Sequence, residues 1–523
     1  MIMIKKVEGI RGLNTKKTFL SAMVISVCIL LSRFTGLLRD IFFAKYLGSG
    51  IVAEAFYVAF RLPNTFRRIF AEGAFSNAFV PFFSSKTKEN KKVANDFSFR
   101  VFGLLVCLLF LLTLAMEVFM PTVIKYINPG FFNDKEKFNL AVLLSRICFP
   151  YVVLISLTSF FGSMLQSIGC FAPFSLVSVI LNFVIVGGLF ATNSVFSNVG
   201  TCLSWILIFA GILQMFFVLF FCIKKGLLPK RYTKDLNNEE VNENKKDLKS
   251  FIRKFLSAMV SSGILQINIF VDGLFASFFV GAVSYLYYAD RLVQFPMSII
   301  GYSLSVAILP SLSIAFKEKK IEEIADLQKK SLSVALFFSL PATFLLFSLS
   351  REIVSLLFER GAFTSEDAII VARMLAIFAF SIPFNVVNKI LFACFYSQKN
   401  TATPMHISLF ALIFNVVSNV ILFKLVGMYC VIISTTLSAV FSFFYALFAL
   451  CKVKSLFIGF ENLRGYLKIL FVALASCLLL PLFLCKLHVL IVLFLSGIVY
   501  LLLCFVFRIL TKDFLRKVFL RKK

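Results

Sequence analysis

The sequence predicts an all-α polytopic membrane protein with about 14 transmembrane helices, arranged as two parallel six-helix lobes around a central cavity plus two C-terminal helices. Three observations predict this class: the composition, the length of the apolar runs and an internal repeat. Of the 523 residues, 60% are hydrophobic and only 15% are charged, whereas soluble domains are about 45–50% apolar and about 25% charged. This composition excludes a soluble enzyme, a disordered chain and a secreted disulfide scaffold. It also argues against a nucleic-acid-binding protein, whose basic residues lie on a polar fold.

The apolar runs have the length of membrane-spanning helices. A helical span needs about 20 mostly apolar residues, whereas the strands of an outer-membrane barrel alternate over about ten. Residues 101–120, 201–222 and 487–507 are clear unbroken runs. Closely spaced runs leave a count of 12–14 spans, with 14 preferred. The predicted spans are 18–47, 51–84, 97–120, 138–168, 172–193, 200–223, 251–281, 284–316, 331–357, 366–397, 402–424, 427–451, 463–485 and 487–510.

The distribution of charge predicts the orientation of the chain, which carries a net charge of +28. In the fourteen-span arrangement, the loops and tails on one side hold 37 Lys or Arg and 14 Asp or Glu. The loops on the other side hold six and seven. Because Lys and Arg concentrate in the cytoplasmic loops of membrane proteins, both termini are predicted to be cytoplasmic.

The chain resembles itself at an offset near 230 residues. Residues 56–62 (FYVAFRL) resemble residues 286–292 (LYYADRL), and residues 78–81 (AFVP) resemble residues 307–310 (AILP). Chance similarity between apolar segments is the alternative. Each repeat holds six spans, and an even number preserves the orientation. The repeats are therefore predicted to form parallel lobes, as in transporters that move by alternating access.

The repeat predicts four parts of the chain. They are an N-lobe at 1–223 with spans one to six, a cytoplasmic linker loop at 224–250, a C-lobe at 251–451 with spans seven to twelve, and residues 452–523 with spans thirteen and fourteen and a basic cytoplasmic tail.

Spans one, two and eight contain charged residues where lipid-facing residues would be apolar. A charge at the centre of a span costs about 2.5–3.5 kcal/mol, so most of these side chains must face protein or water. Six arginines against four acids leave an excess of arginine, whose forked guanidinium binds phosphate oxygens. We predict that they bind an anionic substrate or gate its path; a structural ion-pair network is the alternative. The residues are Arg33, Arg39, Asp40, Glu54, Arg61, Arg67, Arg68, Glu72, Asp290 and Arg291.

The spacing of these charges suggests pairs within one helix. Arg33 and Asp40 are seven residues apart, as are Glu54 and Arg61, which places each pair on one helical face. Arg68 and Glu72 are four apart, a favourable spacing for an ion pair.

A second group of residues offers hard oxygen atoms within spans seven, eleven and twelve. Such oxygens suit Na⁺ or a proton, and hydrogen bonding between helices is the alternative. The predicted site comprises Asp272, Asn415, Asn419, Thr435 and the carbonyl of Val431. No cofactor is expected, and transport would be coupled to Na⁺, to H⁺ or to the membrane potential. The chain has only two histidines and no phosphate-binding loop of the GxxxxGK[ST] type, so a transporter is predicted rather than an enzyme.

Four segments resemble the signature of the MurJ (MviN) family of the MOP exporter superfamily. They are SRFTGLLRD at 32–40, RLPN with RRIFAEGAF at 61–75, YYADRL with FP at 287–296, and GAFT at 361–364. The resemblance covers spans one to twelve. It implies a flippase that moves lipid II, the undecaprenyl-diphosphate-linked peptidoglycan precursor, from the cytoplasmic to the periplasmic leaflet of the bacterial inner membrane. It also implies alternating access and a groove for the lipid tail at spans thirteen and fourteen.

The resemblance also implies roles for single residues. The family often has Asp where this chain has Glu54, and some relatives carry Glu at the position of Gln294. The sodium site of the family falls on the five residues of the oxygen group named above. The functional charges of the family fall on Arg33, Arg39, Glu54, Arg67, Arg68, Glu72 and Arg291.

The expected partners are lipid II and membrane lipids, without nucleic acid. A monomer is expected, and an association with cell-wall synthesis proteins is a further possibility. Three alternative functions stay open: a flippase for another polyprenyl-diphosphate glycan, a cation-coupled multidrug exporter and a non-transporting scaffold. A drug exporter would need acidic groups for a cationic substrate, and a scaffold would not need arginines within its spans.

Overall fold

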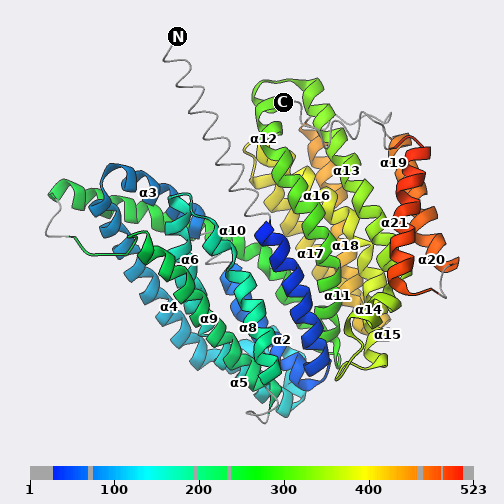
Figure 1. Ribbon diagram of the computed structural model, residues 1–523, viewed down its shortest axis with the longest axis horizontal. Coiled ribbons are helices and arrows are strands. Elements are labelled where there is room, and N and C mark those ends of the chain that lie inside the picture. Colours follow the sequence, from blue (N-terminus) through cyan, green and yellow to red (C-terminus); the bar gives the residue numbers. More distant parts are fainter. Residues whose placement is uncertain are drawn as a thin grey trace. The chain divides into compact units, whose positions relative to one another are not determined.

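The computed structural model describes residues 27–68, 75–191, 198–232, 237–453, 455, 463–483 and 487–509. Within these ranges the chain is helical and contains no strand, which confirms the predicted all-α class (Figure 1). Nine helical stretches of the described residues are long and apolar enough to cross a membrane. One of them, Ala402–Lys452, contains two of the predicted spans. Each predicted span consists mainly of helix where it is described, and the count of fourteen stays a prediction.

The chain forms two compact units, Met1–Leu274 and Phe275–Lys523, called unit 1 and unit 2 below. In unit 1, α2 packs on α5, and α9 contacts α5, α6 and α8. The helices of unit 1 are a helical stretch at 27–47, then α2 (Ile51–Phe66), α3 (Ser76–Glu89), α4 (Lys91–Ile127), η2 (Pro129–Asn133), α5 (Lys135–Cys148), α6 (Tyr151–Ser167), α7 (Ala172–Ser175), α8 (Val177–Ala191), α9 (Val199–Lys224) and most of α10 (Asn238–Ala276).

In unit 2, α17 packs on α18, α16 on α13 and α18, and α11 on α15. The helices of this unit are α11 (Ala282–Met297), η4 (Ser298–Tyr302), α12 (Ser303–Lys317), α13 (Ile321–Ser348), α14 (Ser350–Phe358), α15 (Ser365–Ala379), α16 (Ser381–Ser397), α17 (Ala402–Val426), η5 (Gly427–Tyr429), α18 (Cys430–Lys452), α19 (Leu463–Ala473), η7 (Leu474–Leu479), α20 (Leu480–Phe483) and α21 (Val489–Val506).

Side-chain caps mark where several of these helices begin. Asn90 accepts a hydrogen bond from the Lys92 N–H at the start of α4. Asp134 accepts bonds from two backbone N–H groups at the start of α5. Such caps satisfy donors that the first helical turn leaves without an intrahelical partner.

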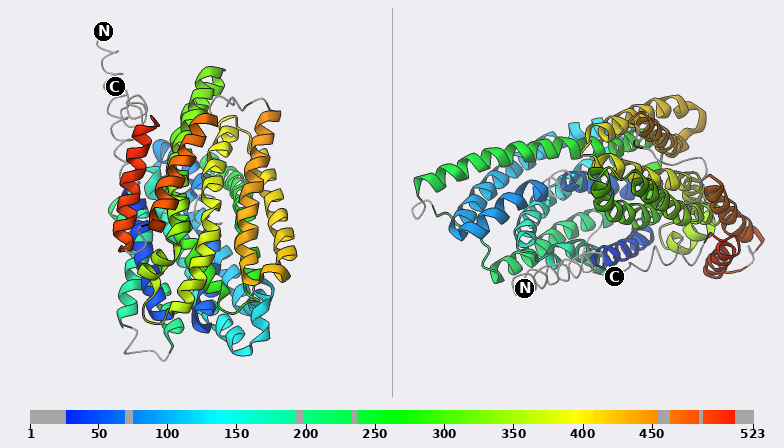
Figure 2. Two further views of the ribbon diagram at one scale, coloured as in Figure 1. Left: turned by 90° about the vertical axis from the view of Figure 1, so that its right-hand side faces the viewer. Right: turned by 90° about the horizontal axis from the view of Figure 1, so that it is seen from above.

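The last helices of the chain attach to unit 2 along α13. Ile469 of α19, Cys477 of η7 and Cys504 of α21 form one buried cluster with Phe337 and other residues of α13. The hydroxyl of Tyr500 donates a hydrogen bond to the backbone carbonyl of Phe337 over 2.7 Å. Figure 2 shows α19 and α21, coloured orange to red, at the edge of this unit. The opposite face of α21 exposes large apolar residues such as Phe505, as expected for a helix that faces lipid.

The linker predicted at 224–250 is not a loop throughout. Residues 238–250 already belong to α10, which continues without a break to Ala276. Asn244 is fully buried and donates to the Val93 carbonyl and to Asp96. Lys86, also buried, lies 2.7 Å from Asp247. These contacts give polar residues buried partners, so a segment whose composition is typical of a solvated linker folds as a helix docked on unit 1.

Aromatic rings complete this docking of α10. The ring of Phe251 is 99% buried, and it contacts the rings of Phe75, Phe79 and Phe97 with centroids 5.8–6.3 Å apart. Edge-to-face packing of this kind adds to the stabilisation from burial alone.

We expect Phe251→Ala to lower the free energy of unfolding by about 3–5 kcal/mol, because it empties a buried ring position. Thermal unfolding of the purified protein measures this effect, and hydrogen exchange of residues 238–254 shows whether the helix has loosened. Leu256→Ala is the control, since Leu256 lies on the same helix and is 51% exposed. Equal unfolding temperatures for the two variants would contradict a docked helix.

Candidate functional site

Arg39 and Asp40, on the first described helix, form a buried ion pair. The Arg39 Nη2 lies 2.7 Å from Asp40 Oδ1, and Nε donates to the same oxygen over 3.1 Å. Arg39 is 7% exposed and Asp40 is 2% exposed. The guanidinium also lies over the rings of Phe43 and Phe60. Both residues are therefore enclosed by protein.

Asn182 of α8 completes this arrangement, and sequence reasoning missed it. Its side-chain oxygen accepts a bond from Arg39 Nη1 over 3.1 Å. Its amide nitrogen donates to the Ser32 carbonyl and the Thr35 hydroxyl. Asn182 thus fixes the helix that carries Arg33 against α8. The one signal in the sequence was an amide within an otherwise apolar run.

Glu54, in the first turn of α2, pairs with Lys137 of α5. The Glu54 Oε2 lies 2.5 Å from the Lys137 Nζ, and the two side chains are 1% and 9% exposed. The sequence spacing had suggested Arg61 as the partner. Sequence reasoning missed Lys137, which stands immediately before the predicted fourth span.

Arg61 and Arg68 of unit 1 both reach α10. Arg61 donates to the Ile269 carbonyl over 3.5 Å, and Arg68 donates to the Gln266 side chain over 3.4 Å. Arg67 and Arg68 follow directly after α2, where the helical turn widens. Glu72 lies outside the described residues.

Burial divides the predicted charges of unit 1 into two groups. Arg39, Asp40 and Glu54 are buried. In contrast, Arg33 is exposed, and Arg61, Arg67 and Arg68 are partly exposed. Among the described charges of unit 1, the arginines of the second group are therefore the ones with a side chain at least partly accessible to a ligand.

In unit 2, Asp290 and Arg291 lie on α11 and are partly exposed. Gln294 donates to Asp290 over 2.5 Å, and the Arg291 guanidinium lies 4.6 Å from the ring centroid of Tyr287. Gln294 therefore holds Asp290 through a hydrogen bond, where a glutamate would bring a second negative charge.

The GAFT segment at 361–364 anchors this part of α11. Gly361 has a φ of 61°, which favours glycine. Phe363 packs on the ring of Tyr288 with centroids 5.0 Å apart. Thr364 caps α15 together with Asp367, and the other carboxylate oxygen of Asp367 accepts a bond from the Tyr285 hydroxyl over 2.9 Å. The segment thus positions the helix that carries Asp290 and Arg291.

Four of the five residues predicted to bind a cation gather on α17 and α18. Asn415 donates to the Thr435 hydroxyl over 3.2 Å, and that hydroxyl donates to the Val431 carbonyl over 2.9 Å. Asn419 donates to Asn415. Asn415 and Asn419 are fully buried, and among the described residues the Asn419 Oδ1 has no hydrogen-bond partner. This buried oxygen fits a small cation. Asp272, the fifth residue, belongs to unit 1.

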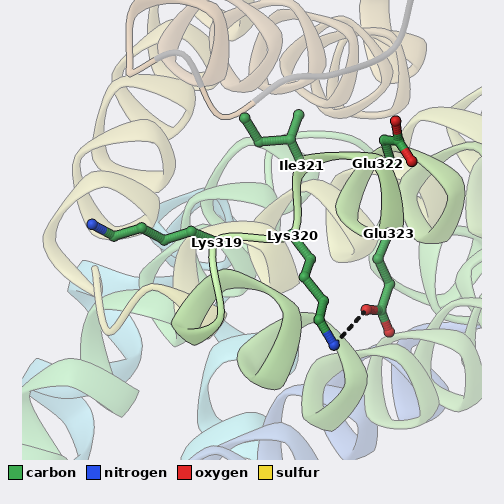
Figure 3. Close-up of a pocket in the computed structure, with 5 residues that line it drawn as sticks. All are labelled: Lys319, Lys320, Ile321, Glu322 and Glu323. Carbon is green, nitrogen blue, oxygen red and sulfur yellow. Dashed lines mark ion pairs between the residues drawn. The ribbon is translucent and has the colours of Figure 1, made fainter.

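A depression of about 380 Å³ lies at the turn between α12 and α13 and contains none of the predicted site residues (Figure 3). Lys320 and Glu323 form an exposed ion pair there at 3.8 Å. A hydrogen bond from Lys320 lowers the pKa of Glu318, which stands outside the apolar segments. Exposed pairs of this kind contribute little to stability, so this is a solvated turn.

Comparison with known proteins assigns the family. The profile described as "Lipid II flippase MurJ" matches residues 43–511. The chain belongs to the MurJ family. A probable lipid II flippase MurJ of Rickettsia prowazekii (strain Madrid E) is 38% identical over 423 residues, which cover 80% of this chain and 81% of that protein. The counterpart in Rhizobium tropici is 36% identical, over 76% of this chain and 74% of that protein.

Solved structures agree with this assignment. A lipid II flippase MurJ in an inward closed conformation is 26% identical, with a TM-score of 0.78, and the match covers 93% of this chain and 98% of that chain. An inward-facing MATE multidrug resistance transporter of the MOP superfamily matches with a TM-score of 0.67 at 14% identity, over 83% of this chain and 99% of that chain. The second likeness concerns the fold alone. The resemblance to the MurJ family is confirmed.

We expect Asn182→Leu to lower the free energy of unfolding by about 1–3 kcal/mol, because a buried donor of Arg39 loses its acceptor. Thermal unfolding measures the change. Phe183→Leu, on the same helix, is the control because Phe183 is 57% exposed. If both variants unfold at the wild-type temperature, the hydrogen bonds of Asn182 do not stabilise the packing of α8 on the first described helix.

Proposed function

We propose that this protein flips lipid II from the cytoplasmic to the periplasmic leaflet by alternating access, for cell-wall synthesis. The observation that carries the proposal is membership in the MurJ family over residues 43–511. Close likeness to a lipid II flippase over 93% of the chain supports it. The physical chemistry agrees, since a diphosphate is a compact anion and a polyprenyl tail cannot leave the lipid phase.

The accessible arginines are the groups that would bind the diphosphate. Arg33, Arg67 and Arg68 in unit 1 and Arg291 in unit 2 are all at least partly exposed. A guanidinium presents two parallel N–H groups to two phosphate oxygens, so a few such residues suffice for a tight contact. The buried pairs of Arg39 with Asp40 and of Glu54 with Lys137 would hold the helices that carry the arginines of unit 1.

We propose that the protein lies in the bacterial inner membrane with both termini in the cytoplasm. The excess of Lys and Arg on one side of the predicted spans supports this orientation. Lipid II and the surrounding lipids are the expected partners, and a monomer suffices for the mechanism. The lipid tail would lie along α19 and α21, whose outward faces carry exposed apolar residues.

The buried oxygen atoms of α17 and α18 favour a transport cycle that is coupled to a Na⁺ gradient. Asn415, Asn419, Thr435 and the Val431 carbonyl offer the hard oxygen atoms that such an ion needs. Coupling to H⁺ or to the membrane potential is the alternative that the experiments below separate.

We expect Arg33→Ala and Arg291→Ala each to abolish flipping while the protein still inserts in the membrane. The reason is the loss of a charge-assisted contact to phosphate. The assay depletes the native protein in cells that carry the variant and measures how much lipid II stays in the cytoplasmic leaflet. Arg360→Ala is the control, since Arg360 is exposed and lies outside the predicted spans. Normal growth of cells that contain only Arg33→Ala would count against the proposal.

Asn419→Leu is expected to remove the dependence of flipping on Na⁺, because it deletes the unbonded buried oxygen. Flipping by the purified protein in liposomes, measured with Na⁺ and with K⁺ outside, tests this. Asn385→Leu is the control, since Asn385 lies outside the cluster and bonds within its own helix. If wild-type flipping is equal in both salts and responds only to a pH gradient or voltage, Na⁺ is not the coupling ion.

A further inference from the structure

The buried pair of Glu54 and Lys137 calls for an explanation that substrate binding does not supply. The two side chains are 1% and 9% exposed, so neither reaches a ligand in this state. Replacing a buried ion pair by apolar groups is often neutral for stability, so stability alone is a weak reason for such a pair. A more specific reason comes from what surrounds Lys137.

Lys137 is held from three sides in unit 1. Its backbone N–H donates to the Asp134 side chain at the start of α5 over 3.1 Å. Its ammonium lies 4.0 Å from the ring centroid of Phe131, which is fully buried in the η2 turn. Its third contact is the Glu54 carboxylate at 2.5 Å. Lys137 therefore ties the first turn of α2 to the turn between α4 and α5.

The same turn holds the end of α10. Asn128, just before η2, is 1% exposed and donates to the Gly273 carbonyl over 3.1 Å. Arg61, on the face of α2 that carries Glu54, donates to the Ile269 carbonyl. The Arg61 guanidinium lies so close to Gly273 that a Cβ at this position would come within 2.0 Å of Nη1. Only glycine fits there without moving the arginine.

These contacts form a closed ring within unit 1. It passes from Glu54 to Lys137, through the η2 turn to Asn128, on to Gly273 of α10 and back through Arg61 to α2. Asp272, the residue predicted to bind the coupling ion, precedes Gly273 directly in α10.

We propose that Lys137 is a positioning residue of the flippase. Through Glu54 and the η2 turn, it fixes the end of α10 around Gly273, and with it the backbone that carries Asp272. This inference rests on the proposed function wherever flipping of lipid II is the measured activity. Glu54 then acts by holding Lys137, and its charge is needed for that contact.

Hydrogen exchange of the purified full-length protein tests the structural part without any substrate. In Lys137→Met, we expect the exchange rates of residues 128–134 and 269–276 to rise at least about tenfold, a modest share of what breaking a buried pair costs. Lys135→Met is the matched control, because it removes the same charge from the same helical turn at an exposed position. A change confined to α2 and α5, with 269–276 protected as in the wild type, would overturn the proposal.

A pair of substitutions that changes the length of the two side chains but keeps their charges tests the functional part of the proposal. Glu54→Asp withdraws the carboxylate by one methylene, and Lys137→Arg extends the donor. We expect flipping by Glu54→Asp to fall at least about fivefold, the lower end of a typical coupling between sites. The double variant is expected to recover most of the wild-type rate and the protection of 269–276.

The outcomes separate this inference from the proposed function. If the wild type flips lipid II and Lys137→Met flips equally fast, Lys137 is not a positioning residue, and the flippase assignment stands. The same holds if the double variant is no better than Glu54→Asp. If the wild type does not move lipid II at all, the proposed function fails, whereas the exchange of 269–276 still decides whether Lys137 holds α10.

Discussion

A charged side chain inside an apolar helix has to be offset by an opposite charge, a polar group or water. Unit 1 is organised around this requirement. Arg39 meets it with Asp40, Asn182 and two aromatic rings, which binds the first described helix to α8. Glu54 meets it with Lys137, which binds α2 to α5. The partners come from different helices, so satisfying each charge also fixes how those helices pack.

The same requirement distinguishes charged residues that stabilise the fold from charged residues that can bind a substrate. Residues that are fully enclosed, such as Arg39 and Glu54, have their charge matched within the protein and add rigidity. Residues such as Arg33 and Arg291 keep part of their surface accessible. An anionic headgroup can therefore approach these guanidinium groups. A flippase needs both kinds of charged residue. The accessible ones bind and release the charged headgroup, and the buried pairs keep the helices that carry them in place.

Much of the fold was predictable because composition and run length follow from the thickness of a membrane. The all-α class, the position of the apolar runs and the group of ten charged residues came from the sequence. The ion-pair partners did not. Spacing along one helix predicts pairs within that helix, whereas Lys137 lies 83 residues from Glu54 and meets it only through the packing of α2 on α5. The helical start of α10 was missed for a related reason, since its polar residues gain buried partners such as Asp96 only after folding.

One hydrogen bond in the attachment of the last helices to α13 has a backbone atom as its acceptor. The Tyr500 hydroxyl bonds to the carbonyl of residue 337, and every amino acid supplies that carbonyl. A substitution at this position of α13 therefore leaves the acceptor in place. This bond between α21 and α13 therefore survives a change of side chain at residue 337, whereas the buried cluster around it depends on the side chains themselves.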